Sequence, residues 1–378
     1  MNYWIEYCEP PRPRPEGVKW DVFISYRSLD RIWTLALYDM LTQCGYTVFM
    51  DQFVLVAGQG LSSQLGKNLG SSASGVLIWS QKAADSKWVE SEFDTMYARK
   101  NNSANEKFPF YFVMASLDGQ QPHGLQDGQI YLDFSEYPDG PTGADLVKLT
   151  CGLQGKPLSE EAVRGVAAFE SSIREEPAKL RAMAEARLFD RILKSIQSED
   201  QAYTTSATLP GIAIELLISG KQVKEAIEAT KFALNRFPNS VRLRQLQGLA
   251  FRRDGQLDEA AYKLNLLLEQ GHRDTETLGI LAAVWADLWE KLKESNDASG
   301  ARDALEKSRN LYEEGFEKVP TDTYTGINAA SKSALLGEMD KAHTFAGNVL
   351  DQLKKWKASG TGSRLPIIGS VLPKPRRS

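Results

Sequence analysis

The chain has 378 residues, a length typical of two domains, and 42% of them are hydrophobic and 25% charged. A formal net charge of -4 gives no global field that attracts nucleic acid or an anionic membrane, so we expect neither as a partner. No apolar run approaches the ~20 residues of a membrane span. The chain therefore reads as a soluble, two-domain protein.

Three cysteines, widely spaced and odd in number, argue against a disulfide framework and indicate a reducing, cytoplasmic compartment. They are Cys8, Cys44 and Cys151. The three histidines have no Cys or His close by in sequence, so we expect no metal site. Residues 1–17 contain a Pro-Arg alternation at 11–15 and lack the apolar region of a signal peptide, so they predict a stiff, extended leader.

Residues 18–155 alternate short β-rich runs with amphipathic segments. We expect strands at 21–25, 46–50, 75–80, 108–114 and 130–134, and helices at 30–44, 62–70, 86–99 and 143–153. Asp30 is placed to cap the first of these helices, and the polar run 101–106 indicates a loop. Such alternation with short crossovers predicts a parallel five-stranded sheet with helices on both faces.

The rest of the chain is predicted to be helical. Residues 156–205 are charged and rich in Ala and Leu, which suits one or two connecting helices. Residues 206–356 contain a repeat, because Ala226 and Ala260 lie 34 positions apart in matching contexts. A third unit begins near Thr275 with a long inter-helix loop at 295–300, and a fourth contains Ala330. This period predicts an all-α tetratricopeptide-like solenoid, followed by a flexible tail at 357–378.

Four short motifs resemble the TIR (Toll/interleukin-1 receptor) family. Residues 21–27 are similar to its first box, 45–51 to its second strand and 51–58 to its BB loop, while 86–92 resemble the Trp-x-x-x-Glu start of its catalytic helix. The motifs occur in the family's order, and the resemblance covers the first 155 residues, about two fifths of the chain. The third box has no clear match, and Tyr131 and Phe134 are its nearest candidates. The run at 326–330 resembles part of the tetratricopeptide-like region beside TRAF-binding domains of apoptosis-signalling kinases.

The resemblance implies a flavodoxin-like sheet and an enzyme that cleaves NAD⁺ into nicotinamide and ADP-ribose or a cyclic isomer. NAD⁺ is then the substrate, and no cofactor is needed. Glu92 matches the catalytic carboxylate of the family, and Ser28 stands where many NAD⁺-cleaving relatives carry a basic residue. The substrate-binding positions that the resemblance implies are Tyr26, Arg27, Phe49, Asp51, Leu55, Gly58, Ser80 and Trp88.

The chemistry of NAD⁺ cleavage explains why one carboxylate can suffice. Nicotinamide is already a cationic leaving group, so the difficulty lies in the positive charge that develops on the ribose, which a carboxylate stabilises. Trp88 lies four positions before Glu92 and shares its helix face. The alternative reading is an acidic first helical turn, made by Glu90, Glu92 and Asp94 and favoured by the helix dipole.

Other readings of the pocket residues also remain open. Phe49 is more often a core residue than a pocket residue, whereas Tyr26 and Arg27 end a strand, where open sheets bind ligands. The run from Gly58 lacks the third glycine of a dinucleotide fingerprint, and Asn68 replaces the Ser or Thr of a P-loop. These departures exclude an ordinary dehydrogenase and a nucleoside triphosphatase.

The solenoid is expected to bind an unknown protein or small-molecule trigger. The resemblance also implies self-association through the TIR domains, so the domain pair suggests a conditional NAD⁺-cleaving enzyme similar to bacterial antiphage immune effectors. An alternative is a non-catalytic TIR adaptor with repeats that recruit partners. A third reading makes the repeats the functional part and the TIR fold a dimerisation tag. Glu92 separates the first two, because adaptor-type TIR domains usually lack it.

Overall fold

The protein forms two compact units in a computed structural model. The first contains Met1–Leu216 and Phe232–Leu243, and the second contains Leu217–Lys231 and Arg244–Ser378. At a few helical positions, among them 61–64 and 87–90, only the backbone is described. The residues that the structure describes are 3–27, 30–50, 61–80, 87–119, 131–135, 140–141, 143–204 and 206–358.

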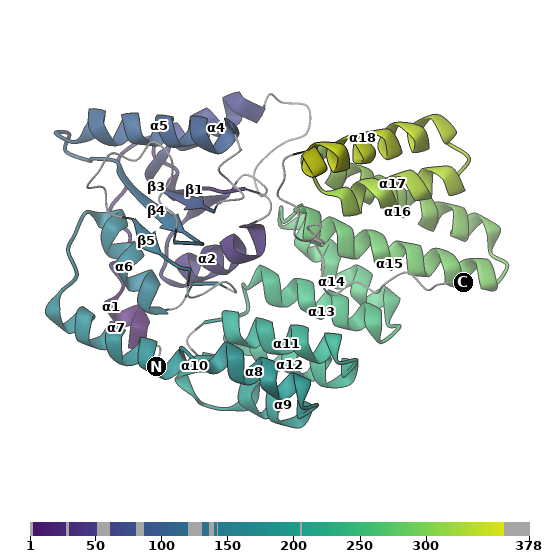
Figure 1. Cartoon of the computed structure of the whole chain (residues 1–378), viewed down its shortest axis with the longest axis horizontal. Helices are drawn as coiled ribbons and strands as arrows, with labels where there is room; N and C mark the ends of the chain where they lie inside the picture. Colours follow the sequence, from purple (N-terminus) through teal and green to yellow (C-terminus); the bar gives the residue numbers. More distant parts are fainter. Residues whose placement is uncertain are drawn as a thin grey trace. The chain divides into compact units, whose positions relative to one another are not determined.

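A five-stranded sheet lies at the centre of the described part of the first unit (Figure 1). Its order is β2-β1-β3-β4-β5, and every neighbouring pair is parallel. This is the flavodoxin-like order, so the predicted fold class of the N-terminal part is confirmed. The strands are β1 (Trp20–Ser25), β2 (Val48–Met50), β3 (Ser72–Trp79), β4 (Tyr111–Ser116) and β5 (Leu132–Asp133).

Helices cover both faces of this sheet. Figure 1 shows α4 (Leu61–Gly70) and α5 (Lys87–Ser103) on one face, and α2 (Arg31–Gln43) and α6 (Gly143–Gln154) on the other. The polar run at 101–106 was predicted to be a loop, but α5 continues to Ser103. The Ser103 hydroxyl donates to the carbonyl of Arg99 (2.8 Å) and accepts from the backbone N–H of Phe110 (2.8 Å). These two bonds stabilise the last turn despite its polar composition.

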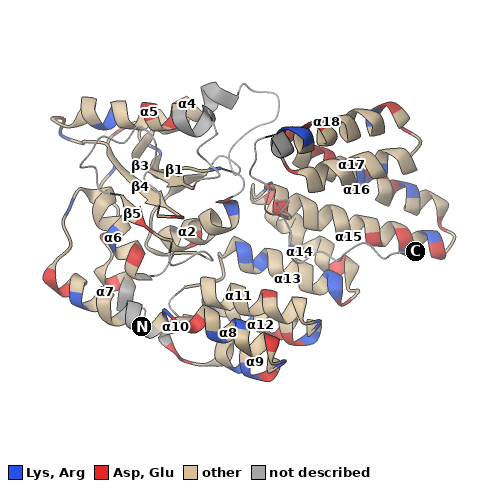
Figure 2. Cartoon of the chain, in the orientation of Figure 1, with Lys and Arg blue, Asp and Glu red and all other residues tan. Residues whose placement is uncertain are grey.

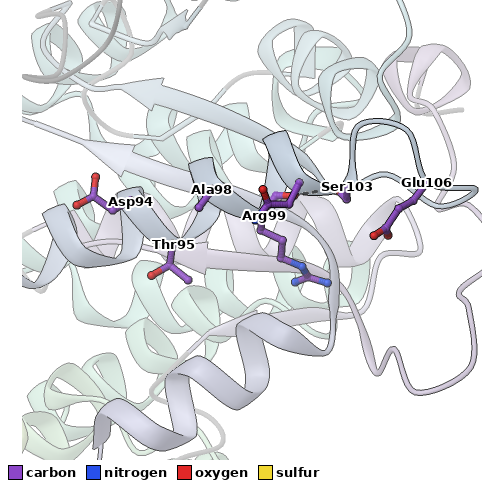
Figure 3. A pocket seen from close by; sticks show the side chains of 7 residues that line it. Asp94, Thr95, Ala98, Arg99, Ser103 and Glu106 are labelled. Atoms are coloured by element: carbon purple, nitrogen blue, oxygen red, sulfur yellow. Dashed lines mark hydrogen bonds between the residues drawn. The ribbon is translucent and has the colours of Figure 1, made fainter.

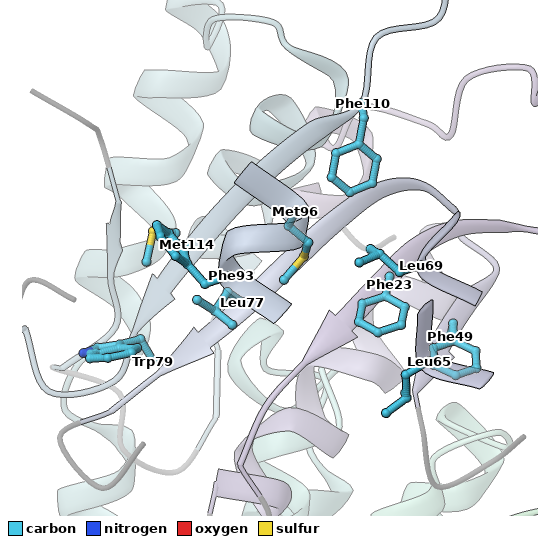
Figure 4. Packing of buried hydrophobic residues seen from close by; sticks show 10 residues of the cluster. All are labelled: Phe23, Phe49, Leu65, Leu69, Leu77, Trp79, Phe93, Met96, Phe110 and Met114. Carbon is cyan, nitrogen blue, oxygen red and sulfur yellow. The ribbon is translucent and has the colours of Figure 1, made fainter. Parts of the chain in front are cut away.

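The core of the sheet domain is a cluster of large apolar side chains between the sheet and helices α4 and α5 (Figure 4). Gly75 of β3 permits this packing, because a Cβ there would lie 2.6 Å from the sulfur of Met96 on α5. The cluster consists of Phe23, Phe49, Leu65, Leu69, Leu77, Trp79, Phe93, Met96, Phe110 and Met114.

The leader is packed against the sheet domain. It begins with a short helix, α1 (Tyr3–Tyr7), so the expectation of an extended segment is wrong for these residues. Arg12 then donates to the carbonyls of Ala73 (2.7 Å) and Pro109 (2.6 Å), and its guanidinium carbon lies 4.8 Å from the centroid of the Tyr111 ring. The arginine thus joins the N-terminal segment to β3 and β4.

Cysteines that are far apart in sequence come together in the first unit. All three thiols are free. A hydrogen bond with Cys44, together with burial, raises the pKa of Cys8 well above its usual range. Burial also raises the pKa of Cys151, and Glu9 and Cys8 add to that effect. Cys8 and Cys151 therefore remain protonated thiols with low nucleophilicity.

The segment between the sheet and the repeats contains more helices than the one or two that we expected. These helices are α7 (Glu160–Ile173), α8 (Glu176–Glu185), α9 (Phe189–Gln197) and α10 (Gln201–Thr204). Pro177 lies at the start of α8, where a missing N–H costs nothing and the ring prevents continuation from α7. Arg187 adopts a positive φ of 57° and turns the chain between α8 and α9.

Four helical hairpins follow in the described chain, which confirms the predicted helical repeat. Ala226 and Ala260 occupy the same position in the second helices of the first two hairpins, and both are 0% exposed. Gly248 allows the Leu264 side chain to pack closely against its backbone, because a Cβ at position 248 would lie 2.6 Å from the leucine side chain. The hairpins are α11–α12 (Thr208–Ser219, Val223–Arg236), α13–α14 (Val241–Arg253, Leu257–Glu269), α15–α16 (Thr275–Glu294, Ala298–Lys318) and α17–α18 (Thr323–Leu335, Met339–Ala358).

The third hairpin differs from the prediction of a long inter-helix loop. Helix α15 ends at Glu294 and α16 begins at Ala298, so the extra residues lengthen the helices and the turn stays short. Asp297 accepts a hydrogen bond from the backbone N–H of Gly300 (2.9 Å) and thereby caps α16. A capped helix start explains why a polar run with a glycine forms no loop here. The predicted tail lies outside the described residues from position 359 onward.

The start of α13 is held by a side chain from α2 within the first unit. The hydroxyl of Ser240 donates to Asp39 Oδ2 (2.9 Å), and the backbone N–H of Val241 donates to Asp39 Oδ1 (3.3 Å). Asp39 and Ser240 are 4% and 2% exposed, so both bonds are shielded from water. The carboxylate satisfies helix N–H groups that otherwise lack partners.

Charged residues of both signs are interspersed along the helices (Figure 2). Within the described ranges, no helix is both long enough and apolar enough to cross a membrane.

Candidate active site at the carboxyl edge of the sheet

The strand order marks the position of the candidate site. Strands β1 and β3 are neighbours, and the helices that follow them, α2 and α5, lie on opposite faces of the sheet (Figure 1). Because the connections after these two strands run to opposite faces of the sheet, a crevice forms between them beyond the carboxyl ends of the strands. Ligands of open parallel sheets bind in this crevice.

Glu92 lies beside this crevice. It belongs to the second turn of α5 and is half-buried. The hydroxyl of Ser25, the last residue of β1, donates to Glu92 Oε2, and Ser25 itself is 2% exposed. A buried donor fixes the position of the carboxylate and favours its charged form. The helix therefore presents Glu92 at the switch point and not as one member of a solvated acidic turn.

Ser80 and Asp30 form a second polar contact at the same edge. The hydroxyl of Ser80, which follows β3, donates to Asp30 Oδ2 (2.7 Å), and both residues are buried. We expected the Asp30 side chain to cap α2, but it occupies the cap position without making a capping bond. Its carboxylate instead joins the start of α2 to the end of β3, and so holds the two sides of the crevice together.

Tyr26 and Arg27 also lie at this edge, directly after β1. Tyr26 is 8% exposed and Arg27 is half-buried. The carbonyl of Arg27 accepts from the backbone N–H of Asp30 (2.8 Å), so the chain turns tightly into α2. The structure thus brings together, at the ends of β1 and β3, the sequence-predicted residues Tyr26, Arg27, Ser80 and Glu92.

Phe49 lies in the core and not at the crevice edge. It is 0% exposed, and its ring stacks on Phe23 with the centroids 5.0 Å apart. Core packing was the alternative reading of this residue, and a direct pocket role for it remains a prediction. Asp51, Leu55 and Gly58 lie outside the described residues, as does the side chain of Trp88. The backbone of α5 does place position 88 four residues before Glu92 on one helix.

The sequence reasoning missed Ser25 and the contact of Asp30 with Ser80. A signal for Ser25 was present, because it is a polar residue at the carboxyl end of an otherwise apolar strand. Its partner Glu92 is 67 positions away, so only the strand order reveals the contact.

Two surface hollows lie elsewhere in the first unit. The larger, about 580 Å³, lies along the solvent face of α5 and is lined by Asp94, Thr95, Ala98, Arg99, Asn102, Ser103 and Glu106 (Figure 3). It contains none of the predicted site residues. The smaller, about 210 Å³, is lined by Ile5, Asp39, Thr42, Gln43, Arg236, Phe237, Pro238, Asn239 and Ser240. In the part of the chain that the structure describes, no three His, Cys, Asp or Glu side chains are grouped to hold a metal ion.

Comparison with protein families agrees with this geometry. The family model for the TIR domain matches residues 22–149, which contain most of β1, strands β2 to β5 and Glu92. The chain carries a TIR domain. A second family model, described as tetratricopeptide repeats-sensor (TPR-S), matches residues 222–336, so a TPR-S domain follows the TIR domain.

Two curated proteins are similar to the TIR domain. One is named "Probable 2' cyclic ADP-D-ribose synthase BdTIR", from Brachypodium distachyon, and is 27% identical over 131 residues, which is 34% of this chain and 57% of that protein. The other is named "2' cyclic ADP-D-ribose synthase AbTIR", from Acinetobacter baumannii, and is 28% identical over 109 residues, which is 29% of this chain and 39% of that protein. The similarity thus spans about half the length of these relatives and is confined to the TIR domain.

Among solved structures, human IFIT1, described as a dimer with PPP-AAAA, is similar with a TM-score of 0.37 and 15% identity. The match covers 55% of this chain and 50% of that one.

Proposed function

We propose that the TIR domain cleaves the bond between nicotinamide and ribose in NAD⁺, with Glu92 as the catalytic carboxylate. The observation that carries this proposal is the Glu92 side chain, held by the buried hydroxyl of Ser25 at the switch point of the sheet. The names of the two TIR relatives support it, because a 2' cyclic ADP-D-ribose synthase makes a product that retains the ADP-ribose part of NAD⁺.

The reaction follows from the charges involved. The bond from ribose C1′ to the nicotinamide nitrogen breaks with its electron pair going to nicotinamide, which leaves as a neutral molecule. Positive charge develops on the ribose, and the Glu92 carboxylate stabilises it. Water or a hydroxyl of the same molecule then bonds to C1′ and loses one proton, which gives ADP-ribose or a cyclic isomer. Arg27, at the same edge, is placed to meet the diphosphate through charge-assisted hydrogen bonds.

A comparison of two carboxylates on one helix tests this proposal. Glu92→Gln keeps the side-chain shape and a hydrogen-bonding oxygen but removes the charge. Asp94→Asn makes the same change two positions away, on the exposed face of α5. Nicotinamide release from NAD⁺, measured at high protein concentration, should fall at least about a hundredfold in Glu92→Gln and stay near wild type in Asp94→Asn. Equal release by Glu92→Gln and the wild type would remove Glu92 from the mechanism.

We propose further that the activity depends on self-association of the TIR domains, that the repeat domain controls it, and that the protein acts as a bacterial immune effector. If association is required, specific activity at fixed NAD⁺ should rise with protein concentration and fall on dilution. A specific activity independent of concentration would contradict this part. A wild-type protein with no release at any concentration would instead support the adaptor role.

A further inference from the structure

Charged and aromatic side chains from three helices of the second unit form one cluster. Arg252, near the end of α13, donates from Nε to Asp287 Oδ2 (2.7 Å) and from Nη2 to Asp287 Oδ1 (3.1 Å), so it binds the α15 carboxylate in a bidentate manner. Lys332 of α17 has its ammonium nitrogen 5.3 Å from the centroid of the Trp289 ring on α15. These contacts link the first helices of three successive hairpins. We call this group, Arg252, Arg253, Asp287, Trp289 and Lys332, the α15 cluster.

Cations of the α15 cluster lie close enough for their charges to oppose one another. Asp287 is already engaged by Arg252. Burial lowers the pKa of Lys332, and nearby Arg252 lowers it further, against the opposing effect of Glu290 and Asp287. Burial likewise lowers the pKa of Arg253, with Arg252 again adding to the effect. Cations that share a partly buried site repel one another, and an anionic ligand reduces that repulsion.

One donor in the α15 cluster has no protein acceptor. The Nη1 atom of Arg252 is buried and makes no hydrogen bond within the described residues. The Arg252 side chain is 11% exposed, so bulk water does not solvate this nitrogen freely. A buried guanidinium donor without an acceptor is costly, and an oxygen atom of a bound ligand removes that cost.

The aromatic surface of the cluster is covered by lysine side chains. Trp285 and Trp289 lie one turn apart on α15, and both are half-buried. The ammonium nitrogen of Lys307 lies 4.2 Å from the centroid of the Trp285 ring. The ammonium nitrogens of Lys293 and Lys332 lie 5.7 Å and 5.3 Å from the centroid of the Trp289 ring. Lys293 and Lys307 are exposed, so they can leave the indole faces without breaking the fold. A planar ring can then replace them on the indole, which frees the ammonium groups to meet negative charge.

Two tyrosines complete the surroundings of Arg252. The hydroxyl oxygens of Tyr312 and Tyr324 lie 3.2 Å apart. Both tyrosines raise the pKa of Arg252 through Coulombic interactions. Burial raises the pKa of Tyr324, so its hydroxyl stays protonated and remains a hydrogen-bond donor. The ring of Tyr324 passes over Gly279 of α15, where a Cβ would lie 3.6 Å from it.

We propose that the α15 cluster binds a small molecule that carries both a phosphate group and a planar aromatic ring, which is the chemistry of a nucleotide. The phosphate oxygens bind Arg252, Arg253 and Lys332, and the ring stacks on Trp289 in place of the lysines. An acidic peptide offers the negative charge but not the flat ring that two adjacent indoles accommodate. The proposal concerns binding to the repeat domain and does not depend on the activity of the TIR domain.

The test is calorimetric titration of the full-length chain carrying Glu92→Gln, so that binding is measured separately from any cleavage. The probes are ADP, pyrophosphate, adenosine and a hexapeptide of glutamates. ADP should bind at least about tenfold more tightly than pyrophosphate or adenosine, because it makes both kinds of contact. Tighter binding of the peptide than of ADP, or no heat of binding with 1 mM ADP, would overturn the proposal.

Matched variants assign the binding to the α15 cluster. Lys332→Met keeps an unbranched side chain about as long as the aliphatic stem of lysine and removes the charge over Trp289. Lys263→Met does the same on α14, where Lys263 lies 5.5 Å from the centroid of the exposed Tyr262 ring. Lys332→Met should weaken ADP binding at least about tenfold, and Lys263→Met less than about twofold. Equal affinity of the two variants would place ADP elsewhere and refute the assignment, and thermal unfolding of each variant verifies that both are folded.

Discussion

Substitution of Ser25 tests whether the hydroxyl beneath Glu92 takes part in catalysis. Ser25→Ala removes the donor to Glu92 Oε2 and leaves a slightly smaller side chain in a site that is 2% exposed. No atom is added, so the backbone of β1 has no reason to move. The expected consequence is a half-buried carboxylate that has lost its donor from the strand and can rotate away from the ribose.

The size of the effect follows from the type of bond. A hydrogen bond to a charged group contributes about 1.5–3 kcal/mol. Since about 1.4 kcal/mol is a tenfold change in rate, kcat/KM for nicotinamide release should fall roughly ten- to hundredfold. Loss of the donor also makes protonation of the carboxyl group easier, so the acidic limb of the pH–rate profile should move to higher pH.

The assay is nicotinamide release across pH for the wild type, Ser25→Ala and Ser25→Thr, with Ser74→Ala as the control. Ser74 is also 2% exposed, but its hydroxyl donates to the carbonyl of Asp21 (2.6 Å) on the neighbouring strand. Ser25→Thr retains the hydroxyl and should recover most of the rate. The reasoning fails if Ser25→Ala keeps the wild-type rate and pH profile, or if Ser74→Ala shifts the profile equally.

Two further predictions concern stability. Burial lowers the pKa of His272 from its ordinary value of 6.5 to about 4, so the unfolded chain binds a proton first as the pH falls. The contribution of this residue to the free energy of unfolding is complete above pH 6.5 and is lost between pH 6.5 and 4, by no more than about 3 kcal/mol. In urea unfolding, the free energy of unfolding of His272→Gln should not fall with pH over this range. The same fall as in the wild type would contradict the prediction. Gly248→Ala should lower the melting temperature, since its Cβ would lie 2.6 Å from Leu264, whereas Gly347→Ala, which meets nothing within 4 Å, should not; equal melting temperatures would refute the close-packing argument.

Local patterns were sufficient to predict the fold, but not the contacts at the site. The apolar run at β1 and the 34-residue spacing of Ala226 and Ala260 identified the sheet and the repeats, because each depends on side-chain periodicity along one element. The bond between Ser25 and Glu92 joins two elements, and it follows only once β1 and β3 are known to be neighbours. Strand order depends on tertiary packing, which no local pattern encodes.

The errors in the sequence analysis are also local ones. Residues 295–300 are polar and were predicted as an insertion in a loop, yet the cap by Asp297 places 298–300 in the first turn of α16. The leader was predicted to be extended from its prolines, but residues before the prolines form the short helix α1. At the third hairpin a single capping contact outweighs a weak local preference.

The contact between Asp39 and the start of α13 joins segments of the first unit that are far apart in the chain. Ser240 lies 201 positions after Asp39. Closing so long a loop costs conformational entropy, which the shielded bonds at Asp39 help to offset. Residues Phe232–Leu243 therefore belong to the same compact unit as α2, although repeat residues flank them on both sides in the sequence.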